Sequence, residues 1–371
     1  MLLRILMKHA PRWKKLDFTF SNPETIALLD AVRGRLDSLE LLKISGSPEI
    51  IADMPWSATP CRIFADAPKL RSVDVSLGAF TLELPFGQLK SFNDHWRGAR
   101  AREMSIPEGI SKYLQEMGQV EEYKLHGREL ENVTPMMDDI RLPFLRALYA
   151  GDPRILRSII APKLEEVHVQ LFNKEFREAN LSALLLQIER SGCALRKITL
   201  GDCILVVNEF ISILRASPTL EELILTFTGW NARVNSCFLE ILPSLRIKVP
   251  RLTKLDVIVQ QKHKSRSVPS MPFLKDTLIE AVENRRNHQV AGVAKLANVQ
   301  VWVAVLVELD MVVSPGAGNV ERWNRLKEGG MGALFYVTGG KADDECPPHI
   351  SCMVRVNSDP MSPAYSQRQY V

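Results

Sequence analysis

The chain has 371 residues, of which 46% are hydrophobic, 24% charged and 7% aromatic, a composition typical of folded proteins that excludes a mainly disordered chain. The formal net charge is +4, from 47 basic and 43 acidic residues, and both signs are interspersed along the chain. We therefore expect no nucleic-acid partner, because nucleic-acid binders concentrate positive charge on one face or stripe.

The first residues, 1–8, are apolar but carry Arg4 in their middle and have no small-residue cleavage site. We therefore expect no secretory leader. The most apolar stretch, 299–313, is interrupted by polar residues and is too short to span a bilayer, so no membrane partner is expected. Six cysteines are scattered through the chain, which indicates reduced thiols in a cytoplasmic or nuclear protein.

From this start onward, one short sequence motif, which we call the phrase, recurs along the chain. A small or apolar residue and Pro precede an apolar anchor, which is followed by two polar residues and then by alternating apolar and polar residues. The clearest copies have their anchors at Trp13, Leu70, Leu164, Leu220 and Leu252. Weaker copies have anchors at Leu39, Leu89, Val120, Leu145 and Leu195, with a degenerate copy at 296–301.

The spacing of the anchors indicates the fold class. Successive anchors are 19 to 32 residues apart, from Leu70 to Leu89 at the shortest and from Leu220 to Leu252 at the longest, against roughly 20 to 29 for leucine-rich repeats. Alternation after each anchor predicts a short strand with one apolar side, which a single repeat cannot bury. The sequence therefore predicts an α/β fold: an irregular leucine-rich-repeat solenoid over residues 1–340, with parallel strands on the concave face and helices on the convex face.

Helices are predicted between several strands, where they would cover the outer side of the sheet. In the first, Asn22 caps a helix with Pro23 in its first position, and the helix ends at Gly34. The other predicted helices cover residues 105–117, 152–160, 174–191, 206–216, 232–242, 272–287 and 320–328. From residue 341 onward the chain is polar and contains several prolines, so residues 341–371 are predicted to form a disordered tail.

These phrases resemble the leucine-rich-repeat portion of F-box proteins, in the divergent set expanded in fungi. The likeness lies in the opening phrase at 9–16, in the Ala-Pro-Lys-Leu phrases at 67–70 and 161–164, and in the segments 296–313 and 320–331, which look like the terminal strand and helix of such proteins. It covers most of residues 9–338. The resemblance implies a non-catalytic module that recognises an unknown target protein, like the substrate-binding repeats of a ubiquitin-ligase receptor.

One departure from the family bears on the expected partners. The helical F-box that precedes the repeats in the family is not visible, because the repeats begin almost immediately. In the family this box binds a Skp1-type adaptor, so we expect that adaptor as a partner only if a longer form carries an F-box. The alternative is a free-standing leucine-rich-repeat scaffold unrelated to ubiquitin transfer.

Three short motifs invite a ligand-binding or catalytic interpretation, but each departs from the pattern that its chemistry needs. The glycines at 329–332 and 339–340 lack phosphate-loop spacing, and neither Ser nor Thr follows Lys341 to hold magnesium. A nucleophile elbow requires a glycine on each side of its serine, and Ser314 does not have this arrangement. The Cys and His residues of 346–352 have no second pair at zinc-site spacing. We therefore expect no cofactor, no metal site and no enzymatic activity.

The remaining candidate is a surface, which the alternation along the strands defines. If Val167 and Val169 point into the core, His168 points outward on the concave face, where solenoids bind extended partners. Taken alone, His126 and His168 are interpreted as ordinary surface histidines. The alternative for each outward residue is a solvated strand position without a role in binding. The candidate protein-binding residues are Asp17, Asp74, His168, Gln170, Thr199, Thr226, Lys254 and Asp256.

Overall fold

The structure is a computed structural model that describes residues 2–20, 28–46, 61–76, 82–96, 106–127, 139–170, 179–201, 206–228, 232–261, 277–287, 293–305 and 317–338. Several sequence-based predictions lie outside these residues. They are the start of the helix at Asn22, Ser314, the Cys and His residues of 346–352, and the predicted disordered tail.

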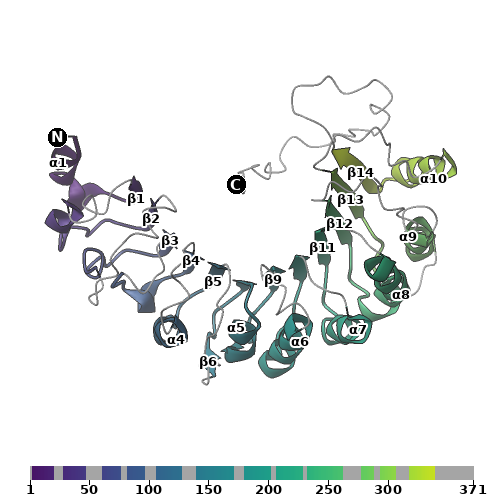
Figure 1. Ribbon diagram of the computed structural model, residues 1–371, viewed down its shortest axis with the longest axis horizontal. Coiled ribbons are helices and arrows are strands. Elements are labelled where there is room, and N and C mark those ends of the chain that lie inside the picture. Colours follow the sequence, from purple (N-terminus) through teal and green to yellow (C-terminus); the bar gives the residue numbers. More distant parts are fainter. Residues whose placement is uncertain are drawn as a thin grey trace.

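The described strands form one parallel sheet of 12 strands that follows the chain order, with β6 and β8 in a separate pair. Figure 1 shows that the sheet curves into an arc, with its strands on the inner side. This long parallel sheet, alternating with helices, confirms the predicted α/β class. The strands are β1 (Lys15–Phe20), β2 (Leu41–Gly46), β3 (Ser72–Val75), β4 (Ser91–Trp96), β5 (Glu122–Gly127), β7 (Ala147–Ala150), β9 (Glu166–Gln170), β10 (Lys197–Gly201), β11 (Glu222–Thr228), β12 (Lys254–Gln261), β13 (Asn298–Val305) and β14 (Gly332–Thr338), and the separate pair is β6 (Ile140–Arg141) and β8 (Ile159–Ile160).

Helices cover the outer side of the arc, most fully toward its C-terminal end (Figure 1). The helices are α1 (Leu2–Met7), α4 (Ile106–Glu116), α5 (Pro153–Ser158), α6 (Ala179–Ser191), α7 (Val207–Ala216), α8 (Ala232–Lys248), α9 (Thr277–Asn287) and α10 (Ala317–Glu328). All of them except α1 fall on predicted helices. Only a short 3-10 turn, Leu29–Val32, is described near the predicted helix end at Gly34, where the backbone has a positive φ of 69°.

Each recurring phrase folds into a turn that leads into a strand. In the clearest copies the anchor N–H donates to the carbonyl three residues earlier, as from Leu70 to Ala67 and from Leu164 to Ala161, both at 3.1 Å. Proline in the second position of these turns supplies the φ that they need. The small residue at the first position is buried, as Ala67 and Ala161 are. A strand then begins two residues after every predicted anchor, from Lys15 after Trp13 onward.

The core lies between the sheet and its outer covering, and the anchors lie along its whole length. Leu70, Leu164 and Leu220 are fully buried. Inward strand residues such as Val167 and Ile198 pack beside them. Because each strand is hydrogen-bonded to the next in register, the core runs without interruption along the described arc.

Around β4 and β5, the core is filled by large aromatic side chains from the sheet and its connections. Phe92 on β4 contacts Phe86, Tyr113 and Tyr123, with ring centroids 5.6 to 6.1 Å apart. Both tyrosine hydroxyls lie at this cluster, and Tyr113 donates to the buried Asp94 carboxylate at 3.3 Å. Burial raises the pKa of Tyr113 well above its ordinary value, so its hydroxyl stays protonated and can donate.

In the C-terminal part of the arc, a buried arginine ties two helices together. Arg285 on α9 is only 4% exposed. Its guanidinium donates to the carbonyls of Leu245, Val249 and Leu252 at 2.6 to 2.9 Å, at the end of α8 and the turn that follows. These hydrogen bonds satisfy carbonyls that the end of a helix leaves without partners. Burial lowers the pKa of Arg285 to about 10, so the group remains charged at neutral pH.

Candidate protein-binding surface

The outward side chains of the sheet lie in lines that cross neighbouring strands on the inner side of the arc. We call this surface the concave face. Parallel register brings the first residue of each strand opposite the first residue of the next, as for Lys197 and Glu222. The third and fifth positions are matched in the same way, as for Asp17 with Lys43 and for Thr19 with Ser45. We call these the first-position, third-position and fifth-position lines.

At the N-terminal end of the concave face, the predicted candidates Asp17 and Asp74 belong to the third-position line. The Asp17 carboxylate lies 3.6 Å from Lys43 Nζ. The Asp74 carboxylate lies 3.4 Å from Nε2 of His95, which comes from β4. Burial raises the pKa of Asp74, and the positive charge of Lys43 partly offsets this. The two acidic residues are therefore brought into one network of charged and polar groups.

The middle of the concave face carries two pairs of stacked rings. His95 and His126 stack with their centroids 4.4 Å apart, and Tyr149 and His168 stack at 5.1 Å. Lys124 Nζ lies 4.6 Å from the centroid of the Tyr149 ring, a cation–π contact. Burial, and then the neighbouring His95, lower the pKa of His126 to about 4, so its imidazole is neutral at pH 7.

The sequence interpretation missed this cluster of rings. It treated His126 as an ordinary surface histidine and did not name His95, Tyr149 or Lys124. Counting from the anchors Leu89, Val120 and Leu145 would have placed those residues at outward positions. Only the register between strands, however, shows that the rings lie against one another.

In the C-terminal half of the concave face, some outward positions are less exposed than alternation alone predicts. Thr199 is 8% exposed and Asp256 7%, although both belong to the third-position line. Ile224 lies between them in register and is itself buried. The curvature of the arc brings neighbouring side chains together, so these residues shield one another.

The other candidates of this half remain at or near the surface. Lys254 lies 3.7 Å from Glu222 and 3.4 Å from Asp256. Burial raises the pKa of Asp256, and Lys254 partly offsets this. Thr226 is half-buried in the fifth-position line. Gln170 is opposite Gly201 in register, and its side chain lies outside what the structure describes.

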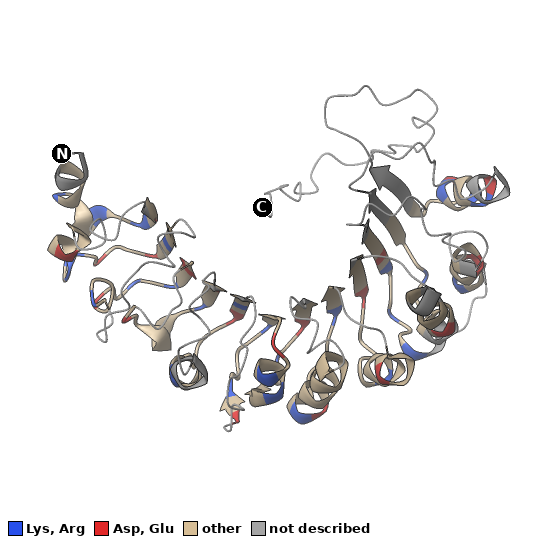
Figure 2. Ribbon diagram, in the orientation of Figure 1, with Lys and Arg blue, Asp and Glu red and all other residues tan. Residues whose placement is uncertain are grey.

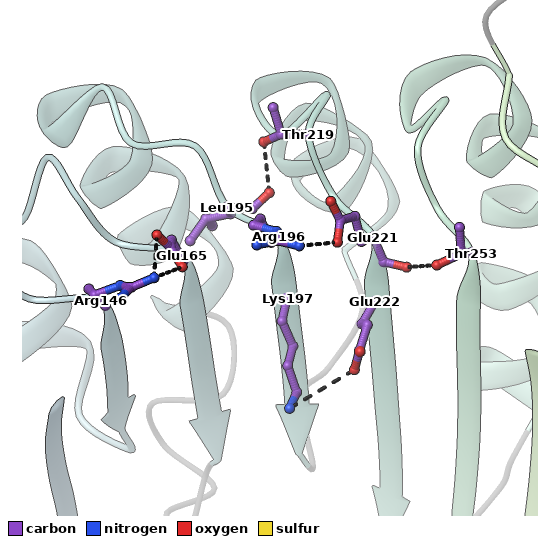
Figure 3. Close-up of polar contacts among 9 residues, drawn as sticks. All are labelled: Arg146, Glu165, Leu195, Arg196, Lys197, Thr219, Glu221, Glu222 and Thr253. Atoms are coloured by element: carbon purple, nitrogen blue, oxygen red, sulfur yellow. Dashed lines mark hydrogen bonds and ion pairs between the residues drawn. The ribbon is translucent and has the colours of Figure 1, made fainter. Parts of the chain in front are cut away.

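At the amino edge of the sheet, the residues just before the strands form a further line of alternating charge. Arg146 donates two hydrogen bonds to Glu165, at 2.9 and 3.0 Å. Arg196 donates to Glu221 at 2.7 Å, as Figure 3 shows. The hydrogen bond from Arg196 lowers the pKa of Glu221. We call this the amino-edge line, and its charges are largely engaged with one another.

Along the described part of the arc, acidic and basic residues are interspersed (Figure 2). The first-position line shows the same alternation, because Lys197 lies between Glu166 and Glu222, at 3.7 and 4.0 Å (Figure 3 shows the contact with Glu222). The concave face therefore has mixed charges that are mostly paired within the protein.

Other chemistry is sparse in the described part of the chain. Among the described residues, no group of three or more His, Cys, Asp or Glu side chains is placed to hold a metal ion. None of the described helices is both long enough and apolar enough to cross a membrane. Burial raises the pKa of Cys193 to about 11, so this thiol is protonated at neutral pH and is a poor nucleophile.

No protein-family model matches the chain, and no curated protein matches it.

Proposed function

We propose that the chain is an irregular leucine-rich-repeat solenoid that binds another protein on its concave face and catalyses no reaction. The observation that carries this proposal is the concave face itself. Lines of outward side chains run across a sheet of 12 strands, while α4 to α10 lie on the opposite, outer side (Figure 1). Repeat solenoids bind extended partners on such surfaces.

The charge pattern favours a protein as the partner. A nucleic acid would need a stripe of one sign, whereas Lys197 and Lys254 alternate here with Glu166 and Glu222. The stacked rings at the middle of the face add aromatic and hydrogen-bonding groups, which are typical of protein interfaces.

The sequence resemblance suggests the wider role. The repeated phrases are similar to the substrate-binding repeats of F-box ubiquitin-ligase receptors, and we extend the proposal to that role. A Skp1-type adaptor would then join only through a longer form that carries an F-box. The alternative is a free-standing leucine-rich-repeat scaffold, and the two roles differ in whether the adaptor accompanies the bound target.

Affinity capture from native extract, with paired variants, tests the proposal. The concave variant combines Lys124→Glu on β5 with Thr226→Glu on β11. The matched control combines Lys112→Glu on α4 with Ser212→Glu on α7, so that each change lies on the helix preceding the same strand and the change in net charge is equal. We expect proteins retained by the unmodified chain to be lost with the concave variant and kept with the control.

The reverse pattern, loss with the helix variant alone, would contradict binding on the concave face. Capture of a Skp1-type adaptor and a cullin together with the target would favour the ligase role. Specific capture of a target without them would favour the scaffold alternative. Turnover of a substrate by the purified chain would contradict the non-catalytic part of the proposal.

A further inference from the structure

The fifth-position line differs from the first-position, third-position and amino-edge lines because it has no Lys, Arg, Asp or Glu residue. It lies at or near the carboxyl ends of the strands, where Thr19 is opposite Ser45 and His95 is opposite His126. Ser76 continues this register after β3, since its N–H donates to Ile44 at 2.9 Å. The line consists of Thr19, Ser45, Ser76, His95, His126, Gly151, Gln170, Gly201, Thr226, Ile258, Trp302 and Tyr336, of which Gln170, Trp302 and Tyr336 are placed by register alone.

The charges of the sheet are concentrated toward its amino edge. The amino-edge line is charged from Lys14 to Glu221, and the first-position and third-position lines are about half charged. Many of these charges pair with a neighbour, as Lys43 does with Asp17 and Lys254 with Glu222. A charged partner would have to compete with these pairs. The fifth-position line offers such a partner no Lys, Arg, Asp or Glu side chain, and its His95 already faces the Asp74 carboxylate at 3.4 Å.

From this pattern we infer that the concave face binds an extended peptide segment without charged side chains, which lies across the strands along the fifth-position line. This inference rests on the proposed function and names the partner's chemistry at the same surface. At about 4.8 Å per strand and about 3.3 Å per residue of extended chain, the line accommodates roughly 13 to 16 residues.

The side chains of the line suit the hydrogen-bonding groups of a peptide backbone. The hydroxyls of Ser45, Ser76 and Thr226 can each donate and accept, and a neutral imidazole has one donor and one acceptor nitrogen. His126 is in that neutral form, because its pKa is lowered to about 4. An extended backbone likewise presents alternating N–H and C=O groups.

The stacking of the rings favours a peptide over a neutral sugar. Sugars bind mainly by stacking on an open aromatic face. Here His95 and His126 are nearly parallel, at 11° and 4.4 Å, so each ring covers a face of the other.

A displayed library of random 15-residue peptides, selected on the immobilised full chain, tests this inference. The variant Ser45→Lys with Ser76→Lys places two charges on the fifth-position line. Its control, Leu41→Lys with Ser72→Lys, places the same number of charges at the first positions of the same two repeats. All four positions are partly buried.

We expect the enriched peptides to be poorer in Asp, Glu, Lys and Arg than the unselected library. The fifth-position variant should weaken the binding of the synthesised peptides about tenfold or more, because it leaves a charge without a partner in the interface. The first-position control should stay within about threefold of the unmodified chain. Thr226→Lys on β11, with Ser91→Lys at the first position of β4 as a control of equal charge change, is a second comparison, so that misfolding of one variant does not remove the test.

Three results would overturn the inference: enrichment of charged peptides, equal weakening by both variants, or failure to enrich any peptide. Binding of neutral oligosaccharides that is lost with the fifth-position variant would overturn the assignment to a peptide. The proposed function is judged separately. If the concave variant abolishes affinity capture while no peptide is enriched, the concave face still binds a protein, but through that protein's folded surface.

Discussion

The region of β3 to β5 and the region of β9 to β12 cover the outer side of the same sheet with different connections. The anchors Leu70 and Leu89 are only 19 residues apart, and the described outer connection is a 3-10 turn, Phe86–Gln88. Leu220 and Leu252 are 32 residues apart, and the outer connection includes the 17-residue helix α8.

The core is filled differently in the two regions. In the first region, aromatic rings from the turn, the strands and α4 pack on one another, as those of Phe86, Phe92 and Tyr113 do. In the second region, the buried residues of the helices are mostly aliphatic, such as Leu184, with Phe210 among them. The comparison teaches that outer connections of different length and composition can bury the same side of one continuous sheet.

The largest expected effect is on the aromatic core. Phe92→Ala should lower the free energy of unfolding by about 3 to 5 kcal/mol, because Phe92 is fully buried and a cavity remains. Since repeats contact mainly their neighbours, hydrogen exchange should accelerate in β3 to β5 and stay nearly unchanged in β9 to β12. Leu223→Ala on β11 is the matched change in the second region. Equal acceleration along the whole arc by Phe92→Ala would mean that the two regions unfold as one unit.

The next effect concerns the helical region. Arg285→Met should lower the free energy of unfolding by about 2 kcal/mol, because the carbonyls of Leu245, Val249 and Leu252 lose their donor inside the protein. Arg285→Lys should cost less, since it keeps a donor but not the planar fork. Urea denaturation measures both, and Arg325→Met at an exposed position of α10 is the control. A more stable Arg285→Met variant would show that the cost of burying the charge outweighs its hydrogen bonds.

Much of this fold was predictable from the sequence, because its determinants are local. The turn at each phrase and the alternation after it involve fewer than ten consecutive residues, and they predict the start of every strand from β1 to β13 except β6 and β8. The strand β14 was missed because it begins at Gly332 and has no apolar anchor phrase.

The helix α8 was predicted to end at residue 242, before Pro243, but it continues to Lys248. Proline disfavours a helix interior, and the packing of α8 against α7 overrides that preference here.

The candidate site was predictable only in part. Alternation identifies which residues point outward, such as His168 and Thr199, but it gives neither their neighbours nor their exposure. The stacking of His168 on Tyr149 and the burial of Thr199 depend on register and curvature across several repeats. These are long-range properties, which a single sequence does not contain.

A smaller effect distinguishes the two regions by their response to acid. The pKa of His126 is lowered to about 4 in the folded protein, against about 6.5 when unfolded. Between these values the unfolded chain binds more protons, so His126 makes stability fall as the pH decreases. The pKa of Asp256 is raised, so the folded protein binds more protons at that site, and stability is gained as the pH falls through the folded pKa.

Urea denaturation at pH 7, 5.5 and 4.5 tests these opposite signs. His126→Gln should lose less stability on acidification than the unmodified chain, and Asp256→Asn should lose more. Asp74, whose pKa is also raised, is present in all three proteins, so its contribution largely cancels from the differences. Identical acid sensitivity of His126→Gln and the unmodified chain would contradict the first sign.

The smallest effect concerns exposed charges, and it compares a line of charges with a separate pair. Arg196→Glu should slightly lower the urea midpoint, because the substituted acidic group would lie between Glu165 and Glu221, whose strands flank β10. Adding Glu221→Arg should restore only part of the loss, because the acidic group at position 196 still faces Glu165. Next to the first region, Arg62 and Glu83, 2.7 Å apart, lie outside the amino-edge line, so exchanging their charges should restore the midpoint fully. These differences should disappear at about 1 M salt, where charges at the surface are screened. Full restoration by the exchange at 196 and 221 would mean that the alternation acts as independent pairs and not as a continuous line.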